Sequence, residues 1–152
     1  ESNPKGYYED ERVKKLPFGK DHSWLEECRG KVIKIVAPLL GDIPANIPVK
    51  VIFMERDMGE VLKSQASMLK RGGRRASGSE DASIAAAYAA QIRNVERMLW
   101  KRPATSVLPV SHADALKDPA GTARAVAEFL GGGLDEQTMA AVIDPSLYRA
   151  RA

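Results

Sequence analysis

The sequence of 152 residues has one cysteine and no long apolar run. Because Cys28 has no second cysteine to pair with, an internal disulfide is excluded and a reducing, cytoplasmic compartment is expected. No apolar segment approaches the roughly 20 residues of a membrane helix, and the amino-terminal residues lack the apolar stretch of a signal peptide. We therefore expect a cytoplasmic protein without a membrane partner.

A strong charge of one sign is also missing. Lys and Arg number 23 against 20 Asp and Glu, which leaves a net charge of +3. Because the excess is so small, we do not expect a nucleic-acid partner, and any preference for anions must be local. His22, His112 and Cys28 lie far apart without ligand spacing, so no metal site is expected. Ser111 beside His112 lacks the flanking pattern of a hydrolase serine.

The residues that are present alternate between β-branched runs and helical patterns, which is typical of an α/β domain. Strands are expected at residues 31–40, 49–55 and 105–111. The second is apolar almost throughout, as in a parallel sheet buried on both faces. The third is weaker because Pro109 cannot donate a ladder hydrogen bond. We expect one domain, residues 1–152, with a mostly parallel sheet and flanking helices.

Capping residues mark where the helices begin. Asp57 precedes a helical pattern that continues to Leu69, and Glu60 three residues later completes a capping-box arrangement. A second helix is expected at residues 80–101, because Pro103 follows it. Asp118 and Pro119 open a third that stops at Gly131. A short last helix is expected after Asp135.

Arg56 directly follows the strand 49–55, and Ser64 comes eight residues later in the next helix. Ligands of open α/β sheets collect beyond the carboxyl ends of the strands, where a guanidinium offers a planar fork for phosphate. Eight helical residues span about 12 Å, so a folded-back arginine and a serine hydroxyl could reach one phosphate. The plainer alternative is that Arg56 pairs with Asp57 or Glu60 and that Ser64 bonds its own helix.

A basic, glycine-rich segment, "KRGGRRASGSED", occupies residues 70–81. Its composition is typical of a solvated surface connector. The alternative is that its cations close over an anionic ligand; these are Lys70, Arg71, Arg74 and Arg75.

The strand followed by "RD" and "EVLKSQ" resembles the sulfotransferase segment that holds the 3′-phosphate of 3′-phosphoadenosine 5′-phosphosulfate (PAPS). "NPKGYYEDERVKKL" and "DPSLYRAR" resemble the ends of a bacterial branch of that family, and "VSHADALKDPAGTARAVAEFLG" resembles its late strand, loop and helix. The resemblance implies a three-layer, P-loop-like fold that transfers a sulfuryl group from PAPS to a hydroxyl or amine. Arg56 and Ser64 would hold the 3′-phosphate.

The phosphosulfate-binding loop of the family does not occur in this sequence, nor does its glycine-rich carboxyl-terminal motif. The resemblance therefore implies a domain incomplete at its amino terminus, in which Arg71, Arg74 and Arg75 could substitute as contacts to the nucleotide. A noncatalytic nucleotide- or anion-binding domain of the same fold is the main alternative. A kinase-like P-loop protein would need an upstream lysine. RNA or DNA binding through residues 70–75 is a further alternative.

The acceptor needs a general base, and the family resemblance favours Glu9 over His22 and His112. The alternative is that Glu9 is a solvated charge among its charged neighbours. The acceptor itself is open: a small molecule, carbohydrate, lipid or peptide. Its pocket could be lined by aromatic side chains, namely Tyr7, Tyr8 and Trp24.

Overall fold

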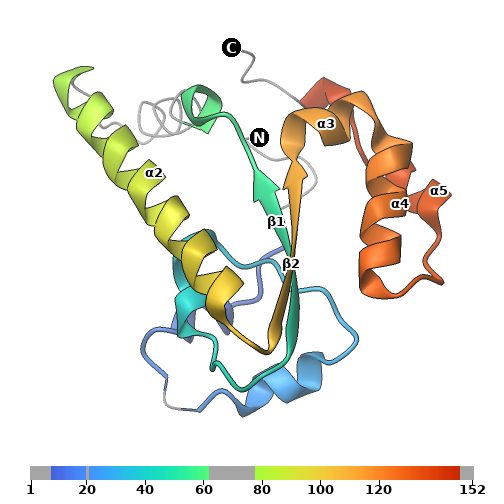
Figure 1. Cartoon of the computed structure of the whole chain (residues 1–152), viewed down its shortest axis with the longest axis horizontal. Coiled ribbons are helices and arrows are strands. Elements are labelled where there is room, and N and C mark those ends of the chain that lie inside the picture. The colour runs from blue at the N-terminus through green and yellow to red at the C-terminus, as the bar shows by residue number, and fades with distance from the viewer. Residues whose placement is uncertain (1–7, 20, 62–77, 148–152) are drawn as a thin grey trace.

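A computed structural model describes residues 8–19, 21–61 and 78–147. Within these ranges, β1 (Val49–Glu55) and β2 (Thr105–Ser111) form a parallel two-stranded sheet (Figure 1). Val49 lies opposite Thr105 and Glu55 opposite Ser111, so both strands end at the same edge. The two strand predictions and their parallel pairing are confirmed. A mixed α/β architecture is thereby established, while the three-layer arrangement stays a prediction.

Helices lie on both sides of the two strands. The long α2 (Gly78–Lys101) precedes β2 and contacts it. After β2 the chain forms α3 (His112–Lys117), α4 (Pro119–Leu130) and α5 (Glu136–Ala141). In Figure 1, α2 lies on one side of the strands and these three helices on the other. None of the described helices is both long and apolar enough to cross a membrane.

Local signals account for the helix ends after β2. The Asp118 carboxylate accepts a hydrogen bond from the Gly121 amide at 2.9 Å, and Pro119 occupies the first helical turn of α4. Gly131 ends α4 at φ 113°, a left-handed conformation that favours glycine. Asp135 caps α5 in the same way as Asp118 caps α4. The predicted starts of α4 and α5 are confirmed.

α3 stands where the family resemblance implied a loop, so that expectation is wrong. The Ser111 hydroxyl accepts a hydrogen bond from the Asp114 amide at 3.2 Å. This contact satisfies one of the amide groups that a helix leaves unpaired in its first turn. The serine at the end of β2 therefore starts a helix immediately.

The strand expected at residues 31–40 is also a wrong prediction. Residues 31–36 form neither helix nor sheet, and the following residues form the 3₁₀ helix η3 (Ala37–Asp42), with Pro38 in its first turn. Ile33 and Ile35 still pack against the core. The alternating pattern encodes an extended backbone, but a strand needs a partner, and no other described strand pairs with this segment.

Three further 3₁₀ helices are described: η1 (Val13–Lys15), η2 (Ser23–Cys28) and η4 (Pro145–Leu147). The main core joins η1, η3, β1 and α2, and Leu99 of α2 is its most buried side chain, at 1% exposure. We call this set the core cluster; its buried members are Val13, Leu16, Leu40, Ile43, Phe53, Val95 and Leu99.

Candidate functional site

A cavity of about 270 Å³ opens at the carboxyl ends of β1 and β2. We call it the strand-end cavity. Because the strands are parallel and end in register, the residues that follow each of them meet there. The lining residues come from the end of β1, the next helical turn and the start of α3; they are Glu55, Arg56, Asp57, Glu60, Ser111, His112 and Ala113.

Arg56 is oriented in this cavity by a buried carboxylate. Its Nε donates to Glu60 Oε2 at 3.0 Å, and the Glu60 side chain is only 8% exposed. Glu60 is the one buried charged residue in the described part of the chain. A buried charge is costly unless it is paired and hydrogen-bonded. The plainer sequence interpretation, that Arg56 pairs with Glu60, is confirmed, and the pair fixes where the guanidinium lies.

Asp57 starts the helix that carries Glu60. Its Oδ1 accepts a hydrogen bond from the Glu60 amide at 3.1 Å, and residues 58–61 are helical. The predicted cap is confirmed for Asp57. The Glu60 carboxylate accepts a hydrogen bond from Arg56. The cap thereby starts the helical turn that places the Glu60 side chain, four residues after Arg56, beside the Arg56 guanidinium.

His112, which directly follows β2, is a titratable residue in the lining of the cavity. Burial lowers the pKa of this imidazole below its usual value, the positive charge of Arg56 lowers it further, and Glu60 opposes both. His112 is therefore a neutral ring at neutral pH, with one nitrogen able to accept a hydrogen bond. The charges of Arg56 and Glu60 therefore both act on the pKa of His112.

The charges around the strand-end cavity do not favour an anion by themselves. Three carboxylates line it, those of Glu55, Asp57 and Glu60, together with the Arg56 guanidinium and the neutral His112. The site offers donors and acceptors for a polar ligand. A strongly anionic ligand requires further positive charge from elsewhere in the chain.

The other residues predicted for the nucleotide lie outside the described residues; they are Ser64, Lys70, Arg71, Arg74 and Arg75. Glu9, the predicted general base, is described. Its Oε1 accepts a hydrogen bond from Lys34 Nζ at 3.3 Å, and it does not belong to the described lining of the strand-end cavity. His22 Nε2 lies 3.3 Å from the Leu16 carbonyl oxygen and is likewise outside that lining.

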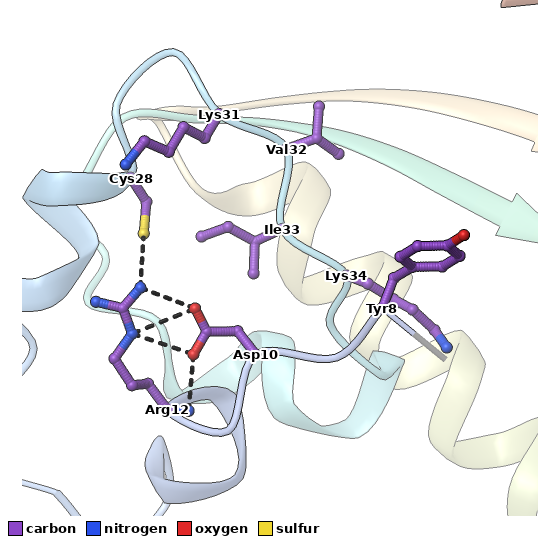
Figure 2. A pocket seen from close by; sticks show the side chains of 8 residues that line it. All are labelled: Tyr8, Asp10, Arg12, Cys28, Lys31, Val32, Ile33 and Lys34. Carbon is purple, nitrogen blue, oxygen red and sulfur yellow. Dashed lines mark hydrogen bonds and ion pairs between the residues drawn. The ribbon is translucent and has the colours of Figure 1, made fainter. Parts of the chain in front are cut away.

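A second, smaller cavity of about 110 Å³ lies beside residues 31–34 (Figure 2). Arg12 dominates it: the guanidinium binds the Asp10 carboxylate at 2.8 Å, approaches Cys28 Sγ at 3.9 Å and stacks 4.9 Å from the centre of the Trp24 ring. The hydrogen bond from Arg12 lowers the pKa of Asp10 to about 2. Arg12 here ties the amino-terminal segment to η2, which is a structural role.

Trp24 and Tyr8, two of the aromatic residues expected around an acceptor, belong to this second region. Trp24 lies against the Arg12 guanidinium, and Tyr8 lines the smaller cavity. Tyr7 lies outside the described residues. The structure thus groups Tyr8 and Trp24 with Arg12 and leaves Arg56 with His112.

The proximity of His112 to Arg56 was missed at the sequence level, although a signal for it existed. Each residue directly follows the last residue of a predicted strand. Once the two strands are parallel and in register, the residues after Glu55 and Ser111 must lie at one edge.

Comparison of the chain with protein-family models, curated proteins and solved structures finds no match. Among the described residues, no three or more His, Cys, Asp or Glu side chains are grouped so as to hold a metal ion. The proposal for function therefore depends on the residues of the strand-end cavity and on the sequence resemblance.

Proposed function

We propose that this chain is a sulfotransferase-type domain whose strand-end cavity binds the 3′-phosphate of PAPS. The observation that carries the proposal is the position of Arg56, which directly follows β1 and lines a cavity at the carboxyl ends of two parallel strands. In α/β sheets this edge is where nucleotide ligands bind. A guanidinium there supplies a planar set of donors suited to phosphate oxygens.

The Arg56–Glu60 pair supports this role. Glu60 holds Nε of Arg56 from a buried position. An arginine held at Nε keeps its orientation before a ligand arrives, so less conformational freedom is lost on binding. The pairing that was the plainer interpretation of the sequence is thus compatible with a phosphate site.

Further positive charge is needed because carboxylates outnumber cations in the described lining. We assign it to the basic segment at residues 70–75, which contains Lys70, Arg71, Arg74 and Arg75. The segment follows the helix that begins after Asp57, so it belongs to the same connection between β1 and α2. Ser64 of that connection is the proposed hydroxyl contact to the same phosphate.

The proposed reaction transfers the sulfuryl group from PAPS to an acceptor hydroxyl or amine, releasing adenosine 3′,5′-bisphosphate. The acceptor oxygen or nitrogen forms the new bond to sulfur, the bond to the bridging phosphate oxygen breaks, and a base takes the acceptor proton. Glu9 remains the proposed base. His112 is assigned to the nucleotide, because it lines the cavity beside Arg56.

Calorimetric titration with adenosine 3′,5′-bisphosphate tests the proposal, with adenosine 5′-monophosphate as the control ligand. We expect selective binding of the bisphosphate. The variant Arg56→Ala should weaken it by roughly 10- to 100-fold, since a hydrogen bond to a charged group contributes about 1.5–3 kcal/mol.

Arg124→Ala is the matched control variant. Arg124 also pairs with a glutamate, Glu136, at 3.8 Å, but it lies on α4 and does not belong to the described lining of the cavity. This variant should bind as the wild type does. Equal affinity for the two nucleotides, or unchanged affinity in a folded Arg56→Ala protein, would contradict the assignment.

A further inference from the structure

The side chains of residues 32–36 alternate between exposed and partly buried, as expected of an extended segment, and the segment pairs with no other described strand. Ile33 and Ile35 pack against the core cluster, whereas Val32 is 86% exposed and Val36 is half-exposed. Val36 has extended backbone angles, φ −72° and ψ 138°. The backbone amides of these four residues donate to no other described residue. Amides that donate to no described residue, together with β-branched side chains, make these four residues a template for another strand.

The sequence of this segment is the same in both directions: Val-Ile-Lys-Ile-Val. If two copies lie antiparallel about a two-fold axis at Lys34, Val32 of each copy faces Val36 of the other. Ile33 faces Ile35 in the same way. An interface of this kind uses one patch twice, which is the requirement for a closed symmetric dimer. The segment is therefore complementary to itself.

We propose that a second copy of this chain pairs antiparallel with residues 32–36, with Lys34 on the two-fold axis. Like charges directly opposite each other destabilise a strand pair. Here each Lys34 brings its own counter-charge, because Nζ lies 3.3 Å from Glu9 Oε1. The exposed valines supply the apolar contact. Since only a short segment from each copy takes part, the dimer is weak and depends on concentration.

Sedimentation equilibrium across two decades of protein concentration tests the association. We expect the wild type to pass from monomer to dimer, and Val32→Lys to stay monomeric because it places new charge on the apolar contact. Phe18→Lys is the matched control: Phe18 is 87% exposed but lies outside the segment, so this variant should dimerise normally. A wild type that stays monomeric throughout overturns the proposal, as does a Val32→Lys protein that dimerises normally.

Disulfide cross-linking tests the register. Residues opposite each other in an antiparallel pair lie within disulfide range. Lys34→Cys should therefore cross-link with itself, and Val32→Cys with Val36→Cys in a mixture. Val32→Cys alone should stay uncross-linked, as should Phe18→Cys and the wild type, whose only cysteine is the buried Cys28. Efficient self-cross-linking of Val32→Cys would show a parallel pairing and overturn the proposal.

Discussion

Residues 8–48, which precede β1, and residues 105–147, which contain β2 and the helices after it, are stabilised in different ways. The first region has three 3₁₀ helices, none with a capping side chain, and its buried Val13, Leu16, Leu40 and Ile43 all belong to the core cluster. In the second region, side-chain caps begin α3, α4 and α5, and the buried residues of α3 and α4 are alanines.

The two regions are stabilised by contacts of different range in the sequence. Helices after β2 are specified by residues a few positions apart, such as Ser111 with Asp114 and Asp118 with Gly121. The earlier region depends on contacts over long distances in the sequence, chiefly with α2, whose Leu99 and Val95 complete the core cluster. Short 3₁₀ helices have little stability of their own and need such packing.

Leu99→Ala should have the largest effect on this comparison. Leu99 is almost fully buried, so truncation leaves a cavity and should lower the free energy of unfolding by about 2–5 kcal/mol. Residues 8–48 should become more accessible to hydrogen exchange before residues 105–147 do. Urea unfolding and hydrogen exchange measure the two effects. The neighbouring exposed Trp100→Ala is the control and should change stability little.

Asp118→Ala should have a smaller effect, confined to the other region. Loss of the cap on α4 should reduce the free energy of unfolding by about 1 kcal/mol. Asp118→Asn retains a capping acceptor and should stay close to the wild type. Urea unfolding compares the three proteins. A cost for Asp118→Asn equal to that of Asp118→Ala would mean that the carboxylate acts in some way other than as a cap.

Asp10→Asn should show its effect mainly in acid. The Asp10 pKa falls from the ordinary 3.8 to about 2 in the folded protein, through Arg12. The resulting stabilisation is complete above the ordinary pKa and is lost as pH falls from 3.8 towards 2. Wild-type stability should therefore decline more steeply than that of Asp10→Asn across this interval. Parallel declines, measured by denaturation at several pH values, would contradict the role given to the Arg12–Asp10 pair.

The sequence was most informative where the signal is local. Both strand segments, β1 and β2, and the caps Asp57, Asp118 and Asp135 agree with the structure. One error, the loop expected where α3 stands, came from the family resemblance, although the Ser111 cap is a local signal. The other error occurred where a strand needs a pairing partner. The β-branched run at residues 31–36 alternates in burial but is not part of the described sheet, because side-chain alternation does not specify a neighbouring strand.

The candidate site was predictable in part for the same reason. Arg56 was singled out because it follows a strand, and its pairing with Glu60 follows from the four-residue helical repeat. His112 was undervalued, because its proximity to Arg56 depends on the register between β1 and β2, which are separated by the whole of α2. The pairing of Glu9 with Lys34 joins residues 25 positions apart and has no local signal.

The most direct test of the nucleotide assignment follows the ring protons of His112 by NMR as pH is varied, with and without adenosine 3′,5′-bisphosphate. His22, the only other histidine, is the internal control. Burial and Arg56 lower the His112 pKa in the free protein, so a phosphate bound beside Arg56 should raise it. An unaltered His112 titration in the presence of saturating bisphosphate would contradict the proposal that the strand-end cavity holds the 3′-phosphate.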